Sequence, residues 1–332
     1  MIISKLNILT LIITLSIYSF TYSQDFHYSM FDMSPLNMNP ALTGYYNANA
    51  RVTAHQRSQW SSVSRPFNTM SLSMDSKNKK IPIAIQINQD NAGDSYFKTL
   101  QANLSSAYSM LSDTIQNLRF GLQIGLTNRS FDITPLSFDA QYNGFNYDSG
   151  LPIMETLNTT SQLYPNINFG ILYNRKLNNK NQLNTSISLY NLNKSNQSFF
   201  GDEVALDIKF ISRIEYKIQL QKFISLKSSL LILRQGSHSE VVAGIEGKYT
   251  ATSFMDINRS FWAGLFYRNK DAMFISAGII HDQWKAAISY DINLSKLIPA
   301  SRYRGGFEIG LVYFIKRKLN LENPLLICPD YL

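Results

Sequence analysis

The stretch "LRFGLQIGLT" (Leu118–Thr127) alternates between two kinds of side chain. Its even-numbered residues are large and apolar, while its odd-numbered residues are Arg119, Gly121, Gln123, Gly125 and Thr127. A repeat of two places alternate side chains on opposite faces of a β-strand. The stretch therefore predicts a strand with one apolar face, which includes Leu122 and Ile124, and one polar or small face.

The same alternation recurs along the chain, for example in "INFGILY" (167–173), "LNTSISL" (183–189) and "GFEIGLVYFI" (306–315). Helical periodicity is weak after residue 23. We therefore predict about fourteen strands. Their expected centres lie near Thr53, Leu72, Ile85, Leu104, Leu122, Phe169, Ile187, Phe210, Leu226, Ile245, Leu265, Ser276, Ile288 and Leu311.

Many alternating strands fit either a soluble β-sandwich or a transmembrane β-barrel. The 20 Phe and 19 Tyr residues, many of them near strand ends, favour a barrel with aromatic girdles. The expected connections also alternate in length, as in outer-membrane barrels with long outer loops and short periplasmic turns. The long ones are Phe131–Tyr164, Asn193–Asp202 and Asn293–Gly305, and short ones include Ser76–Lys80, Ser112–Asn117 and Leu177–Gln182. This parity predicts an all-β, antiparallel outer-membrane barrel whose mature N-terminus is periplasmic.

The first 23 residues have the pattern of a secretory signal peptide. Lys5 precedes an apolar run from Leu6 to Phe20, and small residues follow at Thr21 and Ser23. We expect cleavage before Gln24 and one barrel domain over residues 24–332. Residues 24–48 are predicted to form an N-terminal periplasmic segment, and residues 317–332 a periplasmic tail.

Few residues are arranged for chemistry. The four histidines are not at metal-ligand spacing, and Cys328 is the one cysteine. Ser237-His238-Ser239 raises the hypothesis of a barrel hydrolase, but a polar loop is the simpler interpretation. Asp90–Asp94 lacks the longer pattern of a calcium loop and is read as a hairpin tip. The net charge of +8 is scattered, so it predicts no nucleic-acid partner. We expect no enzyme activity, no cofactor and no metal.

The segment "PLNMNPALTG" (Pro35–Gly44) predicts a deliberate tight turn ahead of the first strand. Asn39 is suited to cap a helical turn, Pro40 to begin it, and Gly44 to end it in the left-handed conformation.

The opening "QDFHYSMFDMSPLNMNPALTG" resembles that of the PorP/SprF family, outer-membrane components of the type IX secretion system of Bacteroidetes. Phe26 replaces the family's usual proline, and Ser34 stands where asparagine is common. Further matching motifs follow in order: "HQRSQW" (55–60), "RPFNT" (65–69), "SMD" (73–75), "DNAG" (90–93), "FGLQIG" (120–125), "WAGLFYR" (262–268), "SYD" (289–291) and "LICPDYL" (326–332). Together they span the expected mature chain.

The resemblance implies a non-enzymatic, multi-pass outer-membrane barrel in the lipid bilayer. It would assist export or surface attachment of a cognate cargo, such as a gliding adhesin. Its partners would be the cargo and type IX secretion components in the periplasm and outer membrane. An uptake channel for a small ligand is the alternative. The family-motif residues expected to contact a partner are Asn39, Pro40, Ala41, Gly44, Gln59 and Trp60. The turn at Asn39–Gly44, expected at the periplasmic mouth, would either plug the lumen, present a contact surface or cap the rim.

Overall fold

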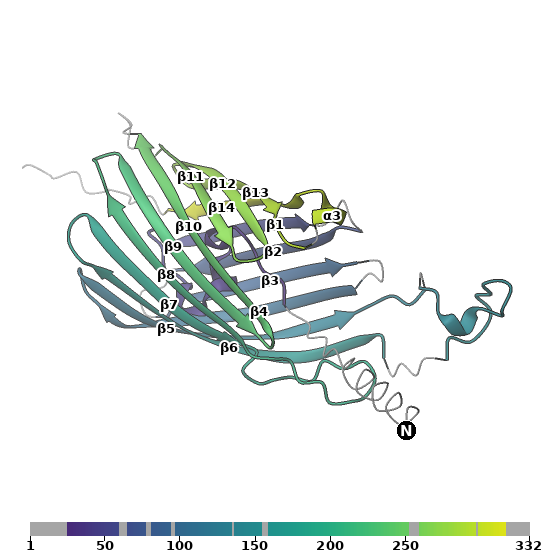
Figure 1. Ribbon diagram of the computed structural model, residues 1–332. Helices are drawn as coiled ribbons and strands as arrows, with labels where there is room; N and C mark the ends of the chain where they lie inside the picture. The colour runs from purple at the N-terminus through teal and green to yellow at the C-terminus, as the bar shows by residue number, and fades with distance from the viewer. Residues whose placement is uncertain are drawn as a thin grey trace, which may run out of the picture.

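The computed structural model describes residues 25–59, 65–77, 81–93, 97–134, 136–154, 159–251, 259–296 and 298–316. These residues form a closed antiparallel β-barrel in which each strand pairs with its sequence neighbours and β1 pairs with β14 (Figure 1). The strands are β1 (Ala50–Gln59), β2 (Phe67–Ser76), β3 (Ile83–Ala92), β4 (Phe97–Ser112), β5 (Gln116–Ser130), β6 (Ser161–Lys176), β7 (Asn181–Tyr190), β8 (Lys209–Gln219), β9 (Ile224–Gln235), β10 (His238–Ala251), β11 (Arg259–Arg268), β12 (Ala272–His281), β13 (Trp284–Asn293) and β14 (Arg304–Ile315).

Each of the fourteen expected strand centres lies within one of these strands, so the predicted fold is confirmed. The predicted faces of β5 are confirmed as well. Leu122 and Ile124 are half exposed on the outside of the barrel, whereas Gln123 and Arg119 are buried inside it. In the closed sheet each of the fourteen described strands has a partner strand on both sides, as a lipid-embedded sheet requires.

The two ends of the barrel differ in the length of their connections. The long-loop end carries the connections that follow β5, β7 and β13, with described residues 131–134, 136–154, 159–160, 191–208, 294–296 and 298–303. These include the short helices η3 (Asp139–Gln141) and α3 (Ile298–Ser301), and residues 136–154 extend well beyond the wall (Figure 1). The short-turn end carries, among others, residues 113–115 and 177–180. The predicted long connections thus lie at one end, but the same end also carries the short β9–β10 and β11–β12 connections, residues 236–237 and 269–271.

The turn between β4 and β5 shows why short connections suffice at that end. The Asp113 carboxylate accepts hydrogen bonds from the backbone N–H groups of Gln116 and Ile115, at 2.6 and 2.7 Å. These bonds close the turn locally. They favour the charged carboxylate and hold the pKa of Asp113 below its usual value.

Residues 25–44, here called the plug segment, lie inside the barrel. They contain the short helices η1 (Phe31–Met33), α2 (Pro35–Met38) and η2 (Pro40–Leu42). The backbone N–H of Asp25 donates to Gln235, the last residue of β9, at the long-loop end. Gly44 contacts Asp75 near the other end, where residues 45–49 lead into β1. This differs from the expected periplasmic segment at the mouth, because residues 25–44 traverse the lumen from the long-loop end to the short-turn end.

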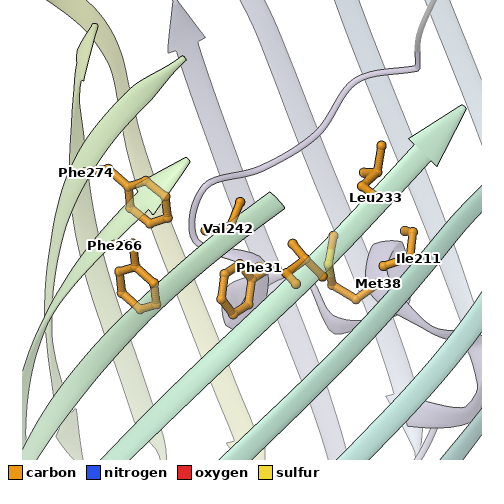
Figure 2. Packing of buried hydrophobic residues seen from close by; sticks show 8 residues of the cluster. Phe31, Met38, Ile211, Leu233, Val242, Phe266 and Phe274 are labelled. Carbon is orange, nitrogen blue, oxygen red and sulfur yellow. The ribbon is translucent and has the colours of Figure 1, made fainter. Parts of the chain in front are cut away.

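The apolar core of the protein forms between this segment and the wall. Phe31 and Met38 pack among wall residues of β8–β12, with Phe31 5.7 Å from Phe266, ring centre to ring centre (Figure 2). A second cluster joins Met30 and Met33 to Trp262 and its neighbours. Each fully buried apolar side chain contributes about 1.5–3 kcal/mol. Apolar packing therefore helps to hold the segment against the inner wall.

No helix among the described residues is long and apolar enough to cross a membrane. Several sequence predictions lie outside the described residues: the signal peptide (1–23), Trp60, part of the Asp90–Asp94 tip, and the tail (317–332) with Cys328.

Candidate functional site

The turn at Asn39–Gly44 is buried against the inner wall of β4, β5 and β6. As predicted, Asn39 caps it: its side-chain oxygen accepts the N–H of Ala41 at 2.8 Å. The amide nitrogen of Asn39 donates to the carbonyl oxygens of Ile171 and Ile187, at 2.9 and 3.1 Å. One side chain thus orders the turn and fastens it to the wall.

Gly44 ends the turn with a φ of +66°, the left-handed conformation that glycine adopts without strain. Its N–H donates to the carboxylate of Asp75 at 2.8 Å. Arg51 forms an ion pair with the same carboxylate at 2.7 Å, and all three groups are buried. A charge-assisted bond to a paired carboxylate fixes the point at which the chain leaves the lumen.

Two glycines of the wall make room for the turn. A Cβ atom at Gly121 would overlap the backbone of Ala41, and one at Gly170 would overlap the side chain of Asn39. Beside them, Arg119 donates to the carbonyl oxygens of Ala41 and Thr43. Wall and turn are complementary in shape and in hydrogen bonding.

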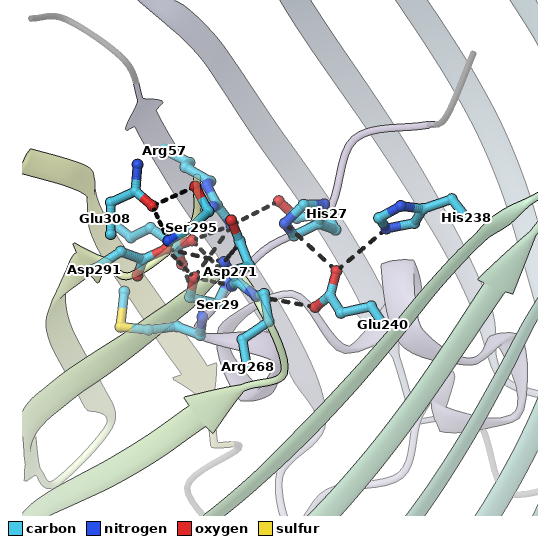
Figure 3. Close-up of polar contacts among 12 residues, drawn as sticks. His27, Ser29, Arg57, His238, Glu240, Arg268, Asp271, Asp291, Ser295 and Glu308 are labelled. Atoms are coloured by element: carbon cyan, nitrogen blue, oxygen red, sulfur yellow. Dashed lines mark hydrogen bonds and ion pairs between the residues drawn. The ribbon is translucent and has the colours of Figure 1, made fainter. Parts of the chain in front are cut away.

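A charged cluster holds the plug segment nearer the long-loop end (Figure 3). Glu308 accepts the backbone N–H groups of Ser29 and Met30 at 2.6 and 2.8 Å. Arg57 bridges Glu308 and Asp291, with both distances 3.1 Å, and these side chains are almost fully buried. Buried charges of this kind are tolerated only when they are paired and hydrogen-bonded.

Asp32 anchors the middle of the plug segment. It forms ion pairs with Arg213 of β8 and, at 2.5 Å, with Lys227 of β9. Glu215 and Glu246 surround the same cations. Charged wall residues therefore contact the plug segment at Asp32 as well as at Ser29 and Met30.

The structure brings together four of the six candidate site residues: Asn39, Pro40, Ala41 and Gly44. Gln59 lies instead at the opposite, long-loop end, where it lines two hollows of about 240 and 440 Å³. Of the residues that hold the turn, sequence reasoning placed Arg119 on the inner face. The sequence did not predict that Gly121, Gly170 and Asp75 contact the turn, because the residues along one strand do not show which segment packs against it.

His238, from the hydrolase hypothesis, lies near the long-loop end. Its Nε2 and that of His27 each lie 3.8 Å from one carboxylate oxygen of Glu240 (Figure 3). The other oxygen of Glu240 is 3.0 Å from Arg268. The histidines are thus part of a charged cluster around Glu240. Among the residues that the structure describes, no group of three or more His, Cys, Asp or Glu could hold a metal ion.

The fold resembles solved outer-membrane channels at very low sequence identity. The Ralstonia pickettii toluene transporter TbuX matches with a TM-score of 0.51 and 10% identity, over 85% of this chain and 94% of that protein. The CymD monoaromatic hydrocarbon channel matches with a TM-score of 0.51 and 8% identity, over 86% of this chain and 93% of that one. At such identities the likeness concerns the barrel fold alone. No curated protein matches the sequence.

A family model matches far more specifically. It describes the type IX secretion system membrane protein PorP/SprF and covers residues 20–313, which include the plug segment and nearly the whole barrel. The family match and the fold together identify an outer-membrane β-barrel protein. The chain therefore belongs to the PorP/SprF family of type IX secretion system membrane proteins.

Proposed function

We propose that this protein is a non-enzymatic outer-membrane component of the type IX secretion system that assists export or surface attachment of a cognate cargo protein. The family match over residues 20–313 is the observation that carries the proposal. Membership implies contact with the secretion machinery. The specific partners would be the cargo and periplasmic or outer-membrane components of that machinery.

The buried plug segment supports a binding role over free conduction. It runs through the lumen from one end to the other, and wall side chains bond to its backbone at Ser29, Met30, Ala41, Thr43 and Gly44. Asn39, Pro40 and Ala41 are buried, so a partner could contact them only if the segment left the lumen. We therefore infer that these residues hold the plug segment in the lumen. They would contact a partner only in a rearranged state in which the segment has left the lumen.

Replacing Asn39, Pro40 and Gly44 together with alanine tests the role of the turn. No strand residue changes, so the barrel should remain heat-modifiable on gels. Export of the cognate surface protein and co-purification of periplasmic components should both decrease. If this folded variant exports and co-purifies like the wild type, the turn has no role in export or in binding periplasmic components.

An uptake channel for a small ligand is the second candidate, favoured by the structural likeness to TbuX and CymD. Conductance in planar bilayers separates the two. For an exporter component with a structural plug, the full-length protein should conduct little, and a variant without residues 25–44 should conduct more. Ligand-dependent conductance of the intact protein would favour the channel.

A further inference from the structure

A large hollow opens at the short-turn end of the barrel. It has a volume of about 1250 Å³ and is here called the vestibule. Residues 44–49 form part of it, where the chain leaves the lumen. The rest of its lining is Lys77, Ile81, Pro82, Tyr108, Ser109, Ser112, Asn117, Arg119 and Lys316. Typical small-molecule sites are about 300–1,000 Å³, so the vestibule has room for a stretch of polypeptide.

The charged residues that line the vestibule are all cations: Lys77, Arg119 and Lys316. Arg119 is committed to the plug segment, since its guanidinium donates to Ala41 and Thr43. Lys77 has no ion pair with any residue that the structure describes. Lys316 pairs with Asp282 at 3.0 Å, but both side chains are nearly half exposed, and such pairs contribute little. Two lysines therefore remain able to bind an anion.

The hollow at the other end has a different balance of charge. There, about 440 Å³ is lined by Arg57, Arg268 and Lys270, with Glu240, Asp271 and Asp291 opposing them. A lining with cations and no anions is thus a feature of the vestibule and not of this hollow. Clefts lined by one sign of charge concentrate ligands of the opposite sign.

The vestibule lysines stand at the ends of two strands that flank β1. Lys77 directly follows β2, which ends at Ser76, and Lys316 directly follows β14, which ends at Ile315. Both strands pair with β1, and both lysines line the hollow at the mouth. This position favours a ligand that enters the mouth over lipid headgroups, which surround the outside of the barrel.

The uncharged lining suits a polypeptide. Tyr45, Tyr46 and Tyr108 offer aromatic surface and hydroxyl groups, and Asn117 offers an amide. Aromatic side chains with a polar tip are typical of protein interfaces.

We propose that the vestibule binds an extended acidic segment of another protein at the mouth of the plugged barrel. The proposal rests on the proposed function and on the predicted periplasmic position of the short-turn end, and it adds the chemistry of the partner. Carboxylates of the segment pair with Lys77 and Lys316, while the tyrosines contact its backbone and apolar groups.

Fluorescence anisotropy with purified full-length protein in detergent tests this directly. The probe is a labelled peptide of Glu alternating with Ser and Leu, and its matched control has Gln for Glu. The acidic peptide should bind and the Gln peptide should bind at least tenfold more weakly. Affinity should fall as salt rises from about 50 to 300 mM, because salt screens charge pairs.

The double variant Lys77→Gln/Lys316→Gln should weaken binding by about tenfold, since each exposed pair is worth up to about a factor of five. Lys176→Gln/Lys180→Gln is the matched control. It removes the same charge from a separate hollow of about 270 Å³ at the same end, and should change affinity less than twofold.

Equal weakening of peptide binding by both double variants would overturn the proposal. The peptide would then be attracted by basic residues spread around the short-turn end and not by the vestibule. Displacement of the peptide by glycerol phosphate would overturn it in favour of lipid headgroups. Binding only to a variant that ends at Lys316 would overturn it in favour of the chain's own tail. The peptide assay does not involve export, so failed binding with normal export rejects the vestibule site alone. If the peptide binds normally but deletion of the gene leaves export unchanged, the secretion role alone is rejected.

Discussion

Gly121 of the barrel wall lies directly against the backbone of Ala41 in the plug segment, and a Cβ atom at Gly121 would overlap the backbone nitrogen of Ala41. The two residues are 80 positions apart and belong to separate motifs, "NPALTG" and "FGLQIG". Their contact shows that these motifs are two sides of one interface.

Gly121→Ala should loosen the plug segment. The added methyl group meets backbone, which cannot move as a flexible side chain would, and overpacking of this kind costs about 1–3 kcal/mol. Amide hydrogen exchange of Leu36–Leu42 should accelerate correspondingly. Gly247→Ala is the control, because a Cβ there meets nothing within 4 Å. Unchanged exchange in Gly121→Ala would mean that the contact does not hold the turn.

Asp32→Ala should release the middle of the plug segment. The change leaves Arg213 and Lys227 without their partner on the segment, and loss of a charged hydrogen bond costs about 1.5–3 kcal/mol. Glu215 and Glu246 still face the cations, so the barrel itself should stay folded. Limited proteolysis should then cut the segment near Phe31. Asp202→Ala removes the same charge from an exposed loop and should leave the cleavage pattern unchanged.

Ile124→Arg should reduce the yield of folded barrel. Ile124 is 50% exposed on the outer face of β5, and arginine at a mid-membrane, lipid-facing position costs about 2–4 kcal/mol. Asn117→Arg in the same strand is the control, because Asn117 lines the vestibule and does not face lipid. The heat-modifiable fraction after refolding into liposomes measures the difference. Similar fractions for both variants would contradict the assignment of the outer face to lipid.

Cysteine labelling of intact cells should report which end of the barrel faces outward. In a Cys328→Ser background, Phe145→Cys in the β5–β6 loop should react with a membrane-impermeant thiol reagent, since Phe145 is 89% exposed. Lys180→Cys at the short-turn end should react only after the outer membrane is permeabilised. The reverse pattern would invert the orientation and remove the vestibule from the periplasm.

Local sequence patterns predict the strands, and loop lengths and aromatic placement then favour a barrel. Each strand carries its own repeat of two, as in Leu118–Thr127, which separates an apolar from a polar face and locates the strand. Local chemistry also fixed the turn: Asn39 caps it, Pro40 begins it, and Gly44 ends it with positive φ. These features depend on residues close together in the chain, so they can be predicted without knowledge of the fold.

The place of the turn and its contacts depend on the tertiary fold. The contacts of Asn39 with Ile171, of Arg119 with Ala41, and of Glu308 with Ser29 join residues that are 132, 78 and 279 positions apart. The alternation along a strand shows that Arg119 and Glu308 face inward, but it does not show what fills the lumen opposite them. The position of residues 25–44 inside the barrel follows from closure of the sheet, which gathers buried charges and small residues from many strands around one axis. The segment satisfies those groups, and no local pattern in the sequence encodes that fit.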